Sequence, residues 1–338
     1  MAPIRLALLG SGIFAREQHL RALKGLAEQF EVVAIYSHSL ANAAALAKTL
    51  PEAVAAYDDL GAVLARTDVD AVDIVLPIAV QPAVVEAALR AGKHVISEKP
   101  VAPDVATGQG LLATAAELTR ASEKVWMVAE NFRYEEAFRL AGKSVREGEL
   151  GRPVQFFWNA YLNISTQDKY YQTAWRRDNS FPGGFLLDGG VHNIAAIRTI
   201  MGEVESLSAF VTQVRADLPP ADSVSATLRF TSGAFGVFTR TFAAEGPWPD
   251  FAHVIGDRGA LRVNPGQLEV TAGGLTTSQT FDMDNVQAEL ADFARIIQDG
   301  QPLRSTPAEA LQDVAVLEAM FDSARLGRPI VPARIVAP

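Results

Sequence analysis

Lys99, Asp188 and His192 are the three residues of this sequence that we identify as candidates for proton transfer. Asp188 and His192 lie four positions apart, so on a helix both would project from one face. A histidine beside a carboxylate can pass a proton to or from a carbinol oxygen. The same pair would also fit an aspartate that caps a helix near a structural histidine. At the end of a parallel strand Lys99 would point into the ligand crevice, although a lysine there is also common as a solvated surface charge.

A glycine-rich turn near the start of the sequence has the pattern of a dinucleotide-binding turn. Residues 10–15 read GSGIFA, which fits G-x-G-x-x-(G/A) directly after an apolar run. Gly10 permits the tight turn, Gly12 lets the backbone approach a pyrophosphate, and the small Ala15 lets the helix pack closely on the strand. The helix N-terminus adds amide donors for the anion. We therefore predict that a nicotinamide dinucleotide binds here, the alternative being an ordinary glycine turn.

The residues after the second predicted strand bear on the choice between NAD and NADP. An Asp or Glu at this position would bind the ribose hydroxyls and repel a 2′-phosphate. The sequence has Tyr36-Ser37-His38-Ser39 instead, which places hydroxyls and an imidazole there. These groups could hold a phosphate, or they could simply be polar loop residues. We predict NADP as the cofactor, with NAD as the alternative.

The predicted elements that position these groups alternate between strands and helices. Short apolar runs predict strands at 4–9, 31–36, 71–76, 94–97 and 125–129, and amphipathic or Ala-rich stretches predict helices at 40–50, 59–66, 82–91 and 105–122. Strands that alternate with helices at this spacing indicate a doubly wound parallel sheet. We expect a Rossmann domain over residues 1–125.

The second part of the sequence has a different texture. Runs such as VQFFWNAYLNI and AFGVFTRTF are rich in β-branched and aromatic residues and are separated by Gly, Pro and Asp, which predicts a mainly antiparallel sheet. Helices are expected at 191–201, 286–298 and 307–326. The fold class is therefore α/β, with an α+β substrate-binding and oligomerisation domain over residues 126–338, whose open sheet is large. The last helix could pack back on the first domain.

Composition excludes several classes of protein. The 338 residues carry a net charge of −9, whereas nucleic-acid or membrane-surface binding needs clustered Lys and Arg. The chain has no cysteine, so disulfides and thiolate chemistry are excluded. His19, His94 and His253 have no metal-ligand spacing, and we predict no metal site. The sequence has no pattern of a signal peptide or membrane span, which favours the cytoplasm.

Three motifs together resemble the glucose–fructose oxidoreductase / inositol dehydrogenase (Gfo/Idh/MocA) family over essentially the whole chain. They are the Gly10-x-Gly12 turn, the string AGKHV-x-x-EKP at residues 91–100, and Asp188-x-x-x-His192. The resemblance implies that Lys99 lies between the nicotinamide and the substrate, that the Lys99-Pro100 bond is cis, and that Asp188 and His192 are catalytic. A lysine placed there suits a proton donor or acceptor.

The resemblance extends the predicted cofactor site to residues that the turn alone does not indicate. The predicted cofactor-binding residues are Gly10, Ser11, Gly12, Ile13, Phe14, Ser37, His38, Leu76, Pro77, Gln81, Glu98, Lys99, Pro100, Asn131, Arg133, Trp175 and Arg176. The sequence departs from the family at Ala195, where an Asp is usual, and at Gln81, where a His is usual. These departures weaken any transfer of a substrate from the inositol or glucose enzymes.

The leading prediction is an NADP-dependent oxidoreductase that acts on a secondary alcohol or carbonyl of a sugar or polyol. One alternative is a regulator of the same fold that senses the dinucleotide, although such a protein could lose Lys99 or His192 without penalty. Another is a redox-assisted glycosidase, which the missing acid after the second strand disfavours. Because Phe230, Phe235, Phe238 and Phe242 recur in the second sheet, we expect one sheet face to pair in a homodimer or homotetramer.

Overall fold

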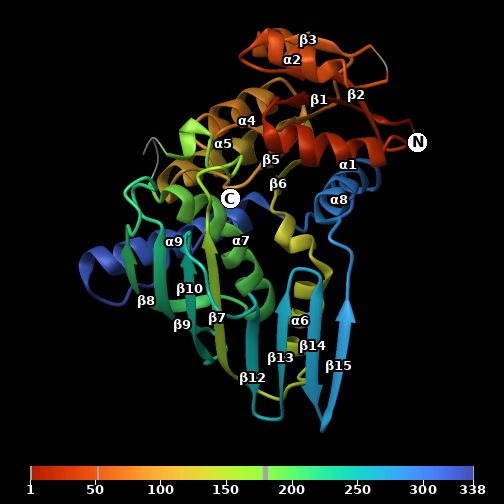
Figure 1. Ribbon diagram of the computed structural model, residues 1–338. Coiled ribbons are helices and arrows are strands. Elements are labelled where there is room, and N and C mark those ends of the chain that lie inside the picture. The colour runs from red at the N-terminus through yellow and green to blue at the C-terminus, as the bar shows by residue number, and fades with distance from the viewer. Residues whose placement is uncertain (1, 52, 178–181, 338) are drawn as a thin grey trace. The chain divides into compact units, whose positions relative to one another are not determined.

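The computed structural model describes residues 2–51, 53–177 and 182–337, and the chain forms two compact units (Figure 1). The first unit comprises Met1–Glu130, Asp284–Leu311 and Val336–Pro338, and the second comprises Asn131–Met283 and Gln312–Ile335. The helix expected at 286–298 therefore belongs to the first unit, although a single cut at residue 125 places it in the second domain. That cut remains a prediction.

The first unit is built on a parallel six-stranded sheet in the order β3-β2-β1-β4-β5-β6. This order reverses direction between β1 and β4, which is where doubly wound sheets bind dinucleotides. Helix α1 packs with α8, and α4 packs with α5. The elements are β1 (Ile4–Leu9), the π-helix η1 (Ala15–His19), α1 (Leu20–Gly25), β2 (Phe30–Tyr36), α2 (Leu40–Ala47), β3 (Ala55–Tyr57), α3 (Leu60–Leu64), β4 (Ala71–Ile74), α4 (Gln81–Arg90), β5 (His94–Glu98), α5 (Val105–Ser122), β6 (Trp126–Ala129) and α8 (Asn285–Asp299).

The second unit is built on a mixed sheet that is mostly antiparallel, in the order β15-β14-β13-β12-β7-β10-β9-β8, with β11 paired to β7. Only β10 and β7 run parallel among these pairs of the described chain. The elements are η2 (Asn131–Tyr134), α6 (Glu136–Arg146), β7 (Pro153–Asn163), η3 (Ala174–Arg176), α7 (Gly184–Met201), β8 (Val204–Thr212), β9 (Ser223–Phe230), β10 (Phe235–Thr241), β11 (Ala243–Ala244), β12 (Ala252–Gly256), β13 (Gly259–Asn264), β14 (Gln267–Ala272), β15 (Leu275–Thr280) and α9 (Pro307–Leu326), of which Gln312 onward lies in this unit. The predicted fold class is confirmed.

Helix α7 begins at Gly184, seven residues before the predicted start at 191. Its glycines lower helix propensity, but tertiary packing requires them. A Cβ on Gly189 would lie 2.6 Å from the ζ carbon of Phe242, and a Cβ on Gly190 would lie 3.2 Å from Leu317. The helix thus comes close to its neighbours at this turn. The short strand β3 was also missed, because three residues give no clear period.

The two faces of the second sheet differ in cover. Helix α7 contacts β9 and β10, and α6 contacts β13 and β14 (Figure 1), so one face is packed. Phe230 and Phe238 are fully buried there and Phe242 is 4% exposed, whereas Phe235 is 52% exposed. Three of the four phenylalanines expected on an open face are therefore core residues, because strand alternation turns them inward.

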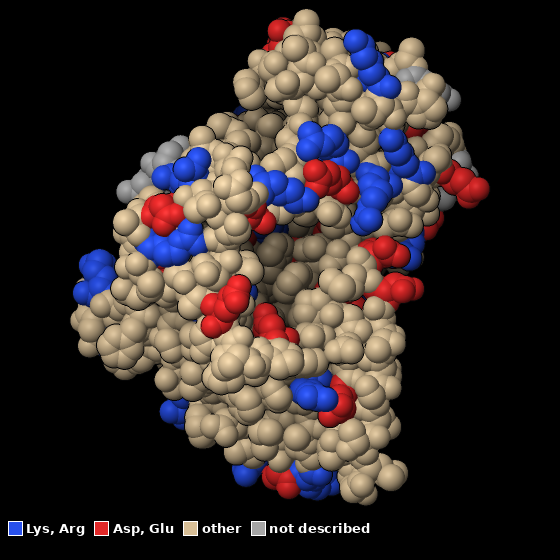
Figure 2. All heavy atoms as spheres, in the orientation of Figure 1, with Lys and Arg blue, Asp and Glu red and all other residues tan. Residues whose placement is uncertain are grey.

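The described residues contain no helix with the length and apolarity needed to cross a membrane. On the face in Figure 2, basic and acidic side chains are interspersed rather than gathered by sign.

Candidate active site

The glycine turn after β1 has the geometry of a phosphate cradle. Gly10 has φ +138°, and a Cβ there would lie 2.2 Å from the carbonyl oxygen of Val75, so only glycine fits. Among the described residues, no atom lies within 4 Å of the position that a Cβ on Gly12 would occupy. Ala15 is fully buried where the helix meets the sheet. The turn therefore leaves open space beside Gly12 that a phosphate can approach.

The carboxyl end of β2 carries hydroxyl groups next to this turn. Ser11 Oγ donates a hydrogen bond of 2.9 Å to Ser37 Oγ, which also accepts from the backbone N–H of Ser39 at 3.4 Å. Ser37 is buried and His38 is exposed. Positions 36–39 hold no carboxylate that would repel a 2′-phosphate, which fits NADP as well as NAD.

Lys99 follows β5 in a segment of backbone that is held on both sides. The Lys99-Pro100 peptide is cis, as the family resemblance predicts. Gln81 Nε2 donates to the carbonyl of Glu98 and, at 2.9 Å, to that of Pro100. The predicted cofactor-binding residue Gln81 is buried, and its amide group spans Lys99. No sequence signal indicates this contact, since 18 positions separate the two residues.

A buried charged cluster supports the same segment and was not predicted. His19 Nδ1 lies 2.8 Å from Asp73 Oδ2, and His19 Nε2 lies 2.9 Å from Glu98 Oε1. Burial alone would lower the pKa of His19, but the two carboxylates outweigh it and leave the pKa well above its usual value. Glu98 Oε2 also accepts the backbone N–H of Lys99 at 3.2 Å. The cluster therefore ties β5 to the π-helix η1.

Glu289 of α8 completes this cluster. It is fully buried, and neither carboxylate oxygen has a hydrogen-bond partner among the described residues. Burial, with the nearby charge of Glu98, raises its pKa well above the usual value. The ligand atoms of His19, Glu98 and Glu289 all lie within 4.8 Å of one another. Such a trio could hold a cation, and the prediction of no metal remains a prediction.

In the second unit, the predicted pair Asp188 and His192 lies within α7. Asp188 is the fifth helical residue, so the alternative in which it caps the helix is wrong. Arg176 Nε donates to Asp188 Oδ2 at 2.6 Å, and the Arg176 guanidinium carbon lies 4.1 Å from the ring centroid of Trp175. His192 stacks on Phe132 with ring centroids 4.8 Å apart. The structure thus brings Trp175, Arg176 and Asp188 together.

The predicted cofactor-binding residues Arg133 and Asn131 differ in whether their polar side-chain atoms already have partners. Arg133 Nη2 lies 2.5 Å from Asp313, which also pairs with Arg198 at 2.6 Å. This buried charge network indicates a structural role for at least part of the Arg133 guanidinium. Asn131 Oδ1 is buried and accepts no hydrogen bond within the described chain.

Other predicted residues lie on the Rossmann unit near the ends of its elements. Phe14 packs edge-on against His19, with ring centroids 5.3 Å apart. Ile13, Leu76 and Pro77 are half-buried. They lie just after the strands β1 and β4, at the carboxyl edge of the sheet.

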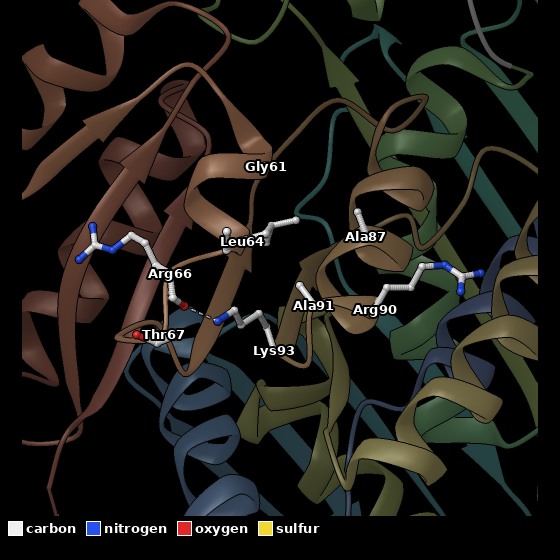
Figure 3. Close-up of a pocket in the computed structure, with 9 residues that line it drawn as sticks. Gly61, Leu64, Arg66, Thr67, Ala87, Arg90, Ala91 and Lys93 are labelled. Carbon is white, nitrogen blue, oxygen red and sulfur yellow. Dashed lines mark hydrogen bonds between the residues drawn. The ribbon is translucent and has the colours of Figure 1, made fainter.

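A pocket of about 550 Å³ lies between the C-terminal ends of α3 and α4 (Figure 3). It opens at the amino ends of β4 and β5, whereas ligands of such sheets bind at the carboxyl ends. Its cations already have partners: Lys93 Nζ donates to the carbonyl of Arg66 at 2.6 Å, Arg66 pairs with Asp68, and Arg90 pairs with Glu86. This pocket is therefore separate from the candidate active site.

Comparison with known proteins identifies both units. Residues 4–124 match the model of an oxidoreductase family with an NAD-binding Rossmann fold, and residues 138–262 match the GFO/IDH/MocA C-terminal domain. The chain is 35% identical to dehydrogenase FPY6 of Fusarium mangiferae over 95% of this chain and 96% of that protein. It is 27% identical to a D-xylose 1-dehydrogenase (NADP(+)) of Haloferax volcanii over 90% and 93%. An oxidoreductase from Thermotoga maritima superposes with a TM-score of 0.90 at 35% identity, covering 97% and 98% of the two chains.

Proposed function

Because the chain belongs to the Gfo/Idh/MocA family and is an NAD(P)-dependent oxidoreductase, we propose that it transfers hydride between NADP and a small carbohydrate-like molecule. The reacting group is a secondary alcohol or carbonyl of a sugar, a polyol or a related compound. The similarity to a D-xylose dehydrogenase supports a sugar substrate. When bound, the nicotinamide ring supplies the hydride acceptor or donor.

The observation that carries this proposal is the fixation of Lys99. Gln81 binds the carbonyls of Glu98 and Pro100, and Glu98 accepts the N–H of Lys99. These contacts orient the backbone from which the lysine side chain projects. An ammonium group that projects from a held backbone can polarise a substrate oxygen or move its proton, and such a role depends on placement. We assign that role to Lys99.

His192 is the proposed acid–base group of the second unit. Its ring stacks on Phe132, which fixes the plane of the imidazole. Asp188 lies one turn earlier on the same helix face, where its charge is balanced by Arg176 at 2.6 Å. We assign proton transfer at the substrate oxygen to His192 and orientation or charge balance to Asp188.

The proposed preference for NADP rests on the end of β2. Ser11 and Ser37 form a hydroxyl pair there, and the exposed His38 adds an imidazole that can donate to a phosphate oxygen. The absence of a carboxylate among residues 36–39 removes the group that would repel a 2′-phosphate. The same features leave room for NAD at lower affinity.

We further propose that the uncovered face of the second sheet mediates a homodimer or homotetramer. Phe210 is 85% exposed, Phe235 52% and Val237 39%. They lie on β8 and β10, which flank β9. Exposed apolar groups on neighbouring strands favour association with an identical face.

The test is a fluorescence titration with NADPH and NADH, followed by an absorbance assay against a panel of sugars and polyols. We expect tighter binding of NADPH and turnover with at least one member of the panel. Lys99→Ala and His192→Ala should each lower turnover by about 10²- to 10⁴-fold. Lys143→Ala is the matched control, since Lys143 is an exposed lysine of α6. Turnover that survives both active-site changes would refute the assigned roles.

A further inference from the structure

Arg240 is a charged residue on the covered face of the second sheet. In the register of β10 its neighbours are Ala160 of β7 and Val224 of β9, and both are buried. The adjacent Thr239 and Thr241 point the other way, where they contact Ser225 and Ser223. Strand alternation therefore places an arginine where the sheet otherwise presents apolar side chains to its helices.

Among the described residues, the guanidinium of Arg240 has no hydrogen-bond acceptor. Its Nε is fully buried without a partner, and within the same part of the chain Arg240 makes no ion pair. It lies 4.3 Å over the ring of Phe242, which stabilises a cation but accepts none of its N–H groups. Burial lowers the pKa of Arg240 to about 10, so the group remains charged at neutral pH. The residue as a whole is half-buried, but an enclosed N–H group such as its Nε is costly without an acceptor and calls for a functional explanation.

Asp250 is the nearest acidic group that influences Arg240, and it is engaged elsewhere. Its Oδ1 accepts a hydrogen bond from the indole N–H of Trp158. Burial raises the pKa of Asp250, while Trp158 and the charge of Arg240 partly offset this. Because the two groups do not form an ion pair, the terminal nitrogens of Arg240, unlike the enclosed Nε, can donate to a bound molecule.

Ring contacts connect Arg240 to the helix that carries Asp188 and His192. Phe242, beneath the guanidinium, packs directly on Gly189, the residue after Asp188. On the other side, His192 stacks on Phe132, which contacts Phe138 with ring centroids 5.5 Å apart. Helix α7 packs on β9 and β10 (Figure 1). Through Phe242, Arg240 lies on the sheet face that this helix covers.

The same ring series continues to the acidic neighbour of Arg240. Phe138 contacts Trp158, with ring centroids 6.0 Å apart, and Trp158 binds Asp250. Phe138 and Trp158 are core residues, so this series of ring contacts connects the surroundings of His192 and of Asp250 through the interior of the second unit.

We propose that Arg240 binds a carboxylate of the substrate, so that the enzyme acts on an acidic sugar or hydroxy acid rather than on a neutral sugar. This inference rests on the proposed oxidoreductase function. The planar guanidinium presents paired N–H donors that match the two oxygens of a carboxylate. The Arg176–Asp188 pair is already balanced, whereas Arg240 makes no ion pair within the described part of the chain, so a ligand can compensate its charge.

The proposal makes a second, independent statement about stability. If Arg240 is present for binding rather than for folding, an apolar residue of similar length should suit this half-buried position on the covered sheet face better than an unpaired cation. Arg240→Met should therefore raise the melting temperature of the protein without ligand. A structural arginine would show the reverse, because its removal would lower the melting temperature.

The experiment measures calorimetric binding of D-glucuronate and D-galacturonate, with D-glucose and D-galactose as neutral counterparts, to the full chain in the presence of oxidised nicotinamide cofactor. The wild type should bind an acid about tenfold or more tightly than its neutral counterpart. Arg240→Met should lose about 10- to 100-fold in affinity for the acid with little change for the neutral sugar. Arg229→Gln is the control, since Arg229 is an exposed arginine of the same sheet.

Equal binding of acids and neutral sugars by the wild type would overturn the inference, as would failure of every acid to bind. A lower melting temperature for Arg240→Met, or an unfolded variant, would show a structural arginine and overturn it as well. The proposed function fails separately, if the wild type binds neither NADPH nor NADH or produces no absorbance change with any compound. Acid binding that depends on Arg240 but gives no turnover would support the carboxylate site while refuting the proposed function.

Discussion

Substitution by alanine should affect different properties at the two glycines of the turn after β1: stability at Gly10 and cofactor affinity at Gly12. Gly10→Ala places a side chain at φ +138°, a conformation that costs about 1–3 kcal/mol for a residue other than glycine. The new Cβ would also lie 2.2 Å from the carbonyl oxygen of Val75. That backbone cannot move freely, because Val75 N–H donates to Leu9 at 2.9 Å. The overlap adds about 1–3 kcal/mol, so the total loss of stability is about 2–6 kcal/mol.

Gly12→Ala has the same added methyl group without the clash. No described atom lies within 4 Å of its Cβ position, so the free energy of unfolding should change by less than about 1 kcal/mol. The methyl group would occupy the space that a phosphate needs. Loss of one charge-assisted hydrogen bond weakens binding by about 1.5–3 kcal/mol, or about 10- to 150-fold in affinity.

Urea denaturation of the protein without ligand and fluorescence titration with NADPH separate the two effects. We expect Gly10→Ala to unfold at lower urea concentration and Gly12→Ala to fold normally while binding NADPH weakly. If Gly12→Ala bound NADPH as tightly as the wild type, this turn would not hold the pyrophosphate. Equal destabilisation by both substitutions would refute the reasoning from the clash with Val75.

Three further predictions concern other parts of the molecule. Burial raises the pKa of Glu289 above its usual 4.5, so the folded protein loses stability as pH rises above that value. The stability of Glu289→Gln relative to the wild type should therefore increase by up to about 1.4 kcal/mol per pH unit until the folded-state pKa is passed. Urea midpoints of the two proteins that change in parallel from pH 5 to 8 would contradict this. Ser37→Asp should shift the ratio of NADPH to NADH affinity toward NADH by about tenfold or more, and an unchanged ratio in fluorescence titrations would remove the basis for NADP. Phe210→Glu should lower the oligomer mass in light scattering, whereas Leu275→Glu, at an equally exposed apolar residue of β15, should not; a monomeric wild type would refute the interface.

Local patterns in the sequence determined most of the architecture. The alternation of apolar runs and helical stretches predicted the parallel sheet, since such periods follow from backbone geometry alone. The turn at Gly10 and Gly12 could be located because its glycines answer local conformational demands. The spacing of Asp188 and His192 likewise indicated their common helix face, because residues four apart are neighbours on any helix.

Contacts between distant residues were decided only by the tertiary structure. Glu289 joins the cluster of His19 and Glu98 from a helix that lies 191 positions after Glu98 and 270 after His19 in the sequence, and no period links them. The hydrogen bonds of Gln81 around Lys99 are equally invisible, because the glutamine by itself is compatible with many environments. The sequence named the lysine, but the residues that hold its backbone depend on how the strands and helices pack.

The sequence also does not reveal which face of the sheet Arg240 occupies. In the sequence, AFGVFTRTF is a strand-like run whose arginine could be a solvated residue at the strand end. Only the register with Ala160 and Val224 turns its side chain to the covered face. Period-two alternation specifies that residues share a face, but which face is buried depends on the elements that pack against the sheet. The cofactor turn could therefore be predicted from neighbouring residues in the sequence, whereas the surroundings of the proposed substrate-binding arginine depend on tertiary packing.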